Sequence, residues 1–226
     1  MKREMKISLW EEYLNVVELP EQQKKNIKEL AHLFFDNVTF LYTVYASIGT
    51  NVSFVEDTET GVRYEEEGSL GIFRKEKTGI FLEIPELKAL LADMIMLFEE
   101  ILPLGTVVDL KKDALAKTMD VSKVQQFRVI VTKRFIGAGE GCYYPYGAVV
   151  YPIGVAGTGK VITFTAPLIE KVVFTGYSDD VEEAFVYQMK YHLIIEQRRK
   201  SAGFATQQEI SELENTVCGL EERYGR

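Results

Sequence analysis

The chain has 226 residues, of which 46% are hydrophobic and 27% are charged, and its formal net charge at pH 7 is −8. A chain of this length and composition can bury a core without disulfides or metal ions, which argues against a disordered protein. An acidic balance disfavours nucleic acid as a partner, because phosphate binding needs clustered lysine and arginine side chains. Two distant cysteines, Cys142 and Cys218, predict no disulfide framework and fit a reducing compartment.

No uncharged apolar run in the chain approaches the roughly 20 residues that a membrane span requires. A signal peptide would need an apolar run behind the basic N-terminal residues, and Trp10-Glu11-Glu12 interrupts it. The sequence therefore predicts a cytoplasmic protein with neither a membrane partner nor a nucleic-acid partner.

Residues 1–101 are predicted to form an N-terminal α+β region. Apolar residues recur at helical spacing near residues 7–17, and Pro20 followed by acid starts a second helix, which we expect to continue to about Ile48. Beyond Val38 the residues become β-branched and aromatic, so a strand remains an open alternative there. Glycines then separate three short antiparallel strands before a further helix with a broad apolar stripe; the strands are expected at residues 62–66, 70–75 and 80–84.

Residues 102–180 are predicted to form a β-rich module, because turn residues separate its apolar segments at intervals typical of an antiparallel sheet or small barrel. A glycine-rich stretch from Gly154 to Lys160 has the spacing of a phosphate-binding loop, but Val161 replaces the hydroxyl residue that would bind magnesium. A hairpin turn is the favoured interpretation, and a nucleotide-dependent enzyme that uses Lys160 is the weaker alternative. We expect strands at residues 106–110, 127–134, 148–153, 161–165 and 171–174.

Residues 181–226 are predicted to form a C-terminal region of two helices. A capping residue and acid at Asp179 to Glu182 indicate the start of the first helix, and its apolar residues, which include Phe185 and Met189, occupy more than one face. The fold class predicted for the whole chain is α+β: N-terminal helices with a small antiparallel hairpin region, a central antiparallel β-sheet or small barrel, and two C-terminal helices.

The last helix carries a narrow apolar seam at coiled-coil spacing, made of Ile210, Leu213, Val217, Leu220 and Tyr224. Together with Phe185 and Met189, this C-terminal seam is the candidate partner-binding site. A seam of about two heptads is equally typical of a helix that folds back on its own domain. The other interpretation is a helix that binds a protein partner or a second copy of the chain.

No residue pattern predicts catalysis. The two histidines, His32 and His192, lie in separate predicted helices, no nucleophile motif occurs, and neither cysteine has a histidine close in sequence. The carboxylate cluster at residues 65–67 lacks the spacing of a cation-binding loop. We therefore expect no catalytic, cofactor-binding or metal-binding residues, no cofactor, and a protein that is not an enzyme.

The segment from Leu102 to about Met189 resembles the DUF4176 family of Gram-positive bacteria. The resemblance rests on three motifs and on the acidic helix that follows the last of them; the motifs are residues 102–108, the turn at residues 144–147 and residues 169–177. The resemblance implies an association with the type VII (Esx) secretion apparatus and its LXG toxins. It implies no catalytic residues.

These observations lead to the hypothesis of a non-enzymatic, cytoplasmic chaperone or targeting adaptor that binds an LXG-type toxin before export. The alternative is an immunity protein that neutralises a cognate toxin. Both roles need a protein partner, either a secreted toxin or a secretion component, and both fit an acidic molecule with apolar helical faces.

Overall fold

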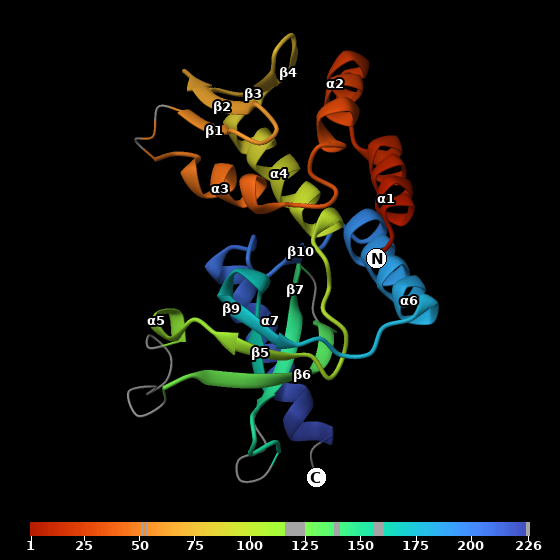
Figure 1. The fold of residues 1–226 in the computed structure, drawn as a ribbon, viewed down its shortest axis with the longest axis vertical. Coiled ribbons are helices and arrows are strands. Elements are labelled where there is room, and N and C mark those ends of the chain that lie inside the picture. Colours follow the sequence, from red (N-terminus) through yellow and green to blue (C-terminus); the bar gives the residue numbers. More distant parts are fainter. Residues whose placement is uncertain (51, 53, 116–124, 138–140, 156–160, 225–226) are drawn as a thin grey trace. The chain divides into compact units, whose positions relative to one another are not determined.

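The computed structural model describes the chain except residues 51, 53, 116–124, 138–140, 156–160 and 225–226, and it describes only the backbone of residues 114–115 and 216–224. The chain forms two compact units (Figure 1). Unit 1 consists of residues 1–100 and 190–197, and unit 2 of residues 101–189 and 198–226. Helices and antiparallel sheets occur in both units, so the predicted α+β class is confirmed.

Unit 1 packs helices against one face of a four-stranded antiparallel sheet with the order β1-β2-β3-β4. The register aligns Tyr64, Phe73 and Ile80 in one row across the sheet, and all three are buried because they face the helices. Its elements are α1 (Arg3–Val16), α2 (Glu21–Ala31), α3 (Thr39–Ser47), β1 (Phe54–Asp57), β2 (Val62–Glu67), β3 (Leu70–Lys75), β4 (Thr78–Glu83), α4 (Ile84–Phe98) and the π-helix η2 (Tyr191–Glu196).

Helix α4 forms the centre of the core of unit 1. A helix that is apolar on nearly all sides is stable only when it is surrounded by other elements. Trp10 of α1 stacks on Tyr13 with 5.1 Å between the ring centroids, and it meets Phe98 of α4 edge-on at 5.2 Å. The buried residues of α4 are Leu87, Leu90, Leu91, Ala92, Met94, Ile95, Met96, Leu97 and Phe98.

The predicted helix from Pro20 to about Ile48 is wrong as a continuous element, because α2 ends at Ala31 and α3 begins at Thr39. Phe34 and Phe35 lie in the break, and both rings are buried. Because the backbone is not helical at these two residues, their adjacent rings can both point into the core. The side-chain oxygen of Asn37 accepts a hydrogen bond from the Thr39 N–H at 2.9 Å, which forms a local turn just before α3. Helix therefore replaces the strand alternative beyond Val38.

A buried lysine holds the C-terminal end of α4. Lys190 Nζ donates hydrogen bonds to the carbonyl oxygens of Leu97, at 3.0 Å, and Glu99. These carbonyls carry the partial negative charge of the helix end. Burial lowers the pKa of Lys190 to about 7, against the attraction of the Glu99 carboxylate. Lys190 thus ties the segment of residues 190–197, which returns from unit 2, to unit 1.

Unit 2 is built on strands β5 to β9, which curl into a partly open barrel. Strand β6 pairs with β5 and β7, β8 pairs with β7, and β9 returns to pair with β5. Only residues 165–168 join β8 to β9, so this segment draws the two sides of the sheet together. The elements are β5 (Val107–Leu110), α5 (Lys112–Leu115), β6 (Phe127–Ile136), β7 (Cys142–Val150), β8 (Ile162–Phe164), the 3₁₀-helix η1 (Ala166–Leu168) and β9 (Ile169–Phe174).

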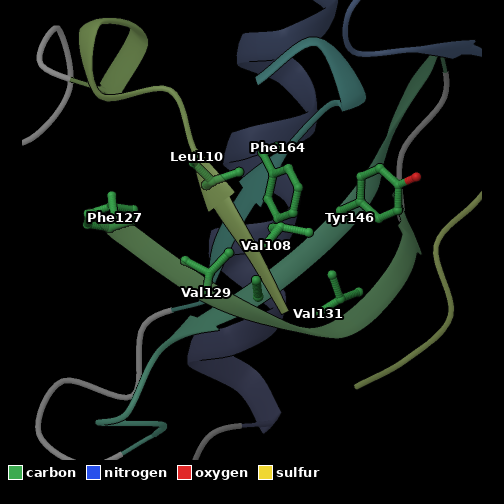
Figure 2. Close-up of a cluster of buried hydrophobic side chains, with 8 residues drawn as sticks. Val108, Leu110, Phe127, Val129, Val131, Tyr146 and Phe164 are labelled. Carbon is green, nitrogen blue, oxygen red and sulfur yellow. The ribbon is translucent and has the colours of Figure 1, made fainter. Parts of the chain in front are cut away.

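The interior of the barrel is apolar. Alternate residues of β5, β6 and β7 point inward, and Phe164 of β8 stacks on Tyr146 of β7 with 5.2 Å between the ring centroids (Figure 2). The Tyr146 hydroxyl accepts a hydrogen bond from the Leu102 N–H at 3.2 Å, which keeps its polar end paired. The buried cluster contains Val108, Leu110, Phe127, Val129, Val131, Tyr146, Ala148 and Phe164.

The predicted turn at residues 144–147 is wrong, because these residues lie within β7. The strand predicted at residues 148–153 likewise begins earlier, at Cys142. The second edge of β7 has two short neighbours: β10 (Lys200–Ser201) pairs in parallel with residues 142–143, and β8 pairs with residues 146–148. Pro145 lies between these neighbours, where a missing backbone N–H costs no strand pairing.

Two helices complete unit 2, and each begins at capping side chains, as predicted for the first of them. In α6 (Asp180–Lys190, whose last residue belongs to unit 1), the Asp179 carboxylate accepts the Glu182 N–H at 2.9 Å. In α7 (Gln207–Tyr224), Thr206 and Glu209 form a reciprocal capping box, with Thr206 N–H donating to the Glu209 carboxylate at 2.7 Å. Within the described residues, no helix combines the length and the apolar character needed to cross a membrane.

Candidate protein-binding surface

The described part of the C-terminal seam packs within unit 2. Leu213 is 1% exposed and Ile210 is half-buried, whereas the side chains of Val217, Leu220 and Tyr224 lie outside the described residues. Two polar contacts fasten α7 to β7. Tyr144 Oη donates to Glu214 Oε1 at 3.0 Å, and Cys142 Sγ lies 3.4 Å from the carbonyl oxygen of Glu209. Burial also raises the pKa of the Cys142 thiol, which disfavours the reactive thiolate.

The two predicted residues on α6 differ in exposure, since Met189 is half-buried and Phe185 is 44% exposed. One side of the Phe185 ring packs against side chains of β6. The ring meets Phe135 of β6 edge-on at 6.1 Å, and the Arg134 guanidinium lies 5.3 Å from its centroid. Arg134 is itself nearly buried and is paired with both carboxylate oxygens of Glu182. Phe185 is therefore held in place while part of its surface faces solvent.

Phe185 is one of several exposed apolar residues that follow one another along the chain from β9 into α6. Tyr177 is 81% exposed, Val181 76% and Phe174 63%, which are high values for residues of this size. We call this set the β9–α6 surface; it consists of Val172, Val173, Phe174, Tyr177, Val181 and Phe185. Clustered exposed apolar side chains mark protein-interaction sites more often than scattered ones do.

Of the β9–α6 surface, only Phe185 was predicted from the sequence as a partner-binding residue. The run of Val-Val-Phe at residues 172–174 predicted a strand, which by itself does not indicate whether its side chains are exposed. Polar and turn residues follow this run directly, at residues 175–180. That change in composition is the sequence feature that could have indicated an exposed surface.

Strand β9 is also the last strand of its sheet. It pairs with β5 along one edge, and no described strand pairs with its other edge. The exit from β9 is fixed, because a Cβ on Gly176 would lie 2.1 Å from the carbonyl oxygen of Leu104. The Gly176 N–H also donates to Thr106 Oγ1 at 3.0 Å. The polypeptide is therefore anchored immediately before the exposed ring of Tyr177.

Beneath β9, a charge pair stabilises its partner strand. Arg128 of β6 donates to Asp109 of β5 through Nε at 2.8 Å and through a terminal nitrogen at 3.0 Å. These hydrogen bonds lower the pKa of the Asp109 carboxyl, and Lys171 of β9, opposite Asp109 in the register, lowers it further. This bidentate pair, in which the Asp109 carboxylate is nearly buried, joins β5 to β6 next to β9 in the sheet.

The β9–α6 surface has a predominantly acidic border. Residues 170–183 contain five carboxylates and one lysine; the carboxylates are Glu170, Asp179, Asp180, Glu182 and Glu183. Of these, Glu182 is paired with Arg134, and the Asp179 carboxylate accepts the Glu182 N–H at the start of α6.

The described part of the chain contains no group of three or more histidine, cysteine, aspartate or glutamate side chains that could hold a metal ion. His192 lies on the exposed surface of unit 1, where Glu196 and Gln197 each contact one of its ring nitrogens at 2.7 Å. Lys160, on which the nucleotide-binding alternative rests, lies outside the described residues.

Residues 101–185 match the model of a protein family described as a domain of unknown function, DUF4176. This segment is a DUF4176 domain. The resemblance predicted for the central part of the chain is thereby confirmed. No curated protein and no solved structure matches the chain. The DUF4176 domain spans β5 to β9 and the first half of α6, so it contains every residue of the β9–α6 surface.

Proposed function

We propose that this DUF4176-containing protein is a non-enzymatic chaperone or targeting adaptor that binds an LXG-type toxin of the type VII secretion system before export. It acts in the cytoplasm, since a toxin must be bound there before it reaches the secretion apparatus. The association with secretion follows from the family resemblance. The binding role is supported by the structure of unit 2.

The observation that supports this function best is the β9–α6 surface. Its aromatic side chains are of a type that is enriched at protein interfaces, and here they are exposed together with three valines. The surface lies wholly within the DUF4176 domain. The described residues of the C-terminal seam contribute less free area, because Leu213 is already buried. We therefore place the main contact on β9 and α6, with Phe185 shared between the two candidate sites.

Co-expression with an LXG-type toxin of the same host tests the proposal. We expect the toxin to co-purify with the wild-type chain. Replacing Tyr177 and Val181 together by serine should reduce the retained toxin at least about tenfold, since apolar anchors dominate interface energies. A matched control replaces Ile153 and Val155 by serine, which are 60% and 70% exposed but lie outside the surface. Equal retention by both variants would refute the assigned surface.

Truncation of the toxin separates this role from the alternative, an immunity protein. A chaperone is expected to bind a toxin fragment that lacks the toxic domain and to increase the amount exported. An immunity protein must bind the toxic domain and abolish its activity in cells. Binding confined to the toxic domain, together with loss of toxicity, would replace the chaperone role by the immunity role.

A further inference from the structure

Residues 190–197 form a strap on unit 1: the segment belongs to unit 1, whereas the residues on both sides of it in the chain belong to unit 2. Three apolar side chains of the strap are buried, and its release would expose them to solvent. These side chains are Leu193, Ile194 and Ile195. The strap begins at Lys190, which is 1% exposed, although lysine is rarely buried without a charged partner.

The hydrogen bonds of Lys190 suit a neutral amine. Its Nζ has two acceptors among the described residues, the carbonyl oxygens of Leu97 and Glu99. A neutral amine has two N–H groups, so both are used. An ammonium has three, and the third would be buried without a described acceptor, which costs stability. The docked strap therefore favours the uncharged form of Lys190.

The ionisable groups that act on Lys190 lie in α1 and directly after α4. Lys6 of α1 is a second buried amine, and it lies 3.5 Å from the exposed Glu100 carboxylate. Glu99 attracts the Lys190 cation, while its carboxylate accepts the Tyr42 hydroxyl of α3 at 2.8 Å. Two buried amines thus stand against one half-buried and one exposed carboxylate. Burial is the larger effect, and it lowers the pKa of Lys190 to about 7 and also lowers that of Lys6.

We propose that residues 190–197 are a pH-sensitive strap, docked on unit 1 while the Lys190 amine is neutral and released when this amine takes up a proton from solvent. Release places the ammonium in water, where a lysine stays protonated up to about pH 10. The released strap therefore binds more protons at Lys190 than the docked strap, and docking strengthens as the pH rises from neutral towards about 10. Glu99 acts in the opposite direction, because burial raises the pKa of its carboxyl. On the strap itself, His192 and Glu196 are exposed and contact each other.

Hydrogen exchange of the amides at residues 191–197, measured on the full chain, tests the proposal. The protection factor removes the pH dependence of the exchange chemistry, so it reports the fraction of released strap. We expect it to rise at least about tenfold from about pH 8 to about pH 9.5, because one proton allows up to about tenfold per pH unit.

Variants of the buried cluster assign the effect to Lys190. Lys190→Met keeps an unbranched side chain without a proton to exchange, so the rise in protection with pH should disappear. Lys6→Met removes a repelling amine and should shift the rise to higher pH, whereas Glu99→Gln removes an attracting carboxylate and should shift it to lower pH. A purely structural role would not produce opposite shifts. Lys25→Met, at an exposed position on α2, should keep the wild-type dependence.

Equal protection of the strap at both pH values in the wild-type chain would overturn the proposal, and so would a pH dependence that persists in Lys190→Met. The nitrogen chemical shift of Lys190 Nζ in the wild-type chain gives an answer that does not depend on whether a variant folds. Titration of this amine below about pH 8 would support a neutral amine in the docked strap, and titration near about pH 10 would overturn it.

Discussion

The terminal strands β4 of unit 1 and β9 of unit 2 differ in whether another element covers their outer edge. In unit 1 the outer edge of β4 is covered by α2, whose side chains satisfy its backbone. Gln23 accepts the Phe81 N–H at 3.3 Å, and Asn26 donates to the carbonyl oxygen of Gly79 at 2.6 Å. In unit 2 the outer edge of β9 has no described strand beside it and carries exposed Val172 to Phe174.

The contrast concerns one edge of each sheet, since β1 is also a terminal strand of the sheet in unit 1. Unpaired strand edges promote aggregation, and proteins usually cover or charge them. The chain covers one edge with a helix, so its sequence can encode such protection. The outer edge of β9 has no comparable side-chain hydrogen bonds among those described for this strand.

The largest expected effect concerns the ion pair that supports the β9–α6 surface. Glu182→Ala leaves the guanidinium of Arg134, which is 5% exposed, without its carboxylate. A buried charge that loses its partner typically costs about 3–5 kcal/mol. We expect unit 2 to lose this much stability, measured by hydrogen exchange of β6 amides, while β4 amides of unit 1 keep theirs.

A double replacement separates the charge from the packing. Arg134→Met combined with Glu182→Leu removes both charges and also the Arg134 Nε, which has no hydrogen-bond partner among the described residues. We expect stability close to that of the wild type, because a buried pair is often replaceable by apolar residues. A double variant as unstable as Glu182→Ala would show that the pair itself, and not the uncompensated charge, stabilises unit 2.

The next effect concerns the C-terminal seam. Leu213→Ala should destabilise unit 2 by about 3 kcal/mol, because truncating a buried leucine removes apolar contacts and leaves a cavity. Hydrogen exchange of the β7 amides measures the loss, and Ile210→Ala, at a half-buried position, should cost less. If Leu213→Ala left exchange unchanged but abolished partner binding, the seam would be an interface and the β9–α6 surface would not be the main one.

A smaller effect is expected when the covered edge of β4 is opened. Gln23→Ala with Asn26→Ala removes two side-chain hydrogen bonds to the strand, worth about 1 kcal/mol each. We expect faster exchange of the Phe81 amide and concentration-dependent self-association by sedimentation. Lys25→Ala, on the same helix, is the control. Unchanged exchange at Phe81 would mean that α2 covers β4 without protecting it.

Much of the fold followed from local patterns. The hairpins of β2 to β4 and the starts of α6 and α7 were predictable because turn glycines and capping residues act within a few positions of themselves. The break at Phe34 and Phe35 was not predictable, since these rings pack against Phe73 of β3 and Phe98 of α4, which are distant in sequence. The strand through Pro145 was missed for a similar reason, because its short neighbours β8 and β10 come from later in the chain.

The candidate site was harder to predict than the fold. Val172 to Phe174 form a strand as expected, but the sequence does not state whether a neighbour covers them, because β-propensity describes a half-buried surface and not its partner. Only the return of β9 to β5 reveals an uncovered edge. The seam shows the converse, since a pattern typical of an interface contains a residue, Leu213, that is already buried within unit 2.

The smallest expected effect is a pH dependence confined to the support beneath β9. The hydrogen bonds from Arg128 hold the pKa of Asp109 below its ordinary value of 3.8, so the stability they provide is complete above that pH and is lost as the pH falls through the lowered pKa. One such group changes stability by at most about 1.4 kcal/mol per pH unit.

Below about pH 4, amide exchange in β9 should therefore accelerate more steeply in the wild type than in Asp109→Asn. Asp113→Asn, at an exposed position on α5, should keep the steep dependence. Equal slopes in all three proteins would show that the pair with Arg128 does not hold β5 under the open edge, and that the surface is supported by the barrel core alone.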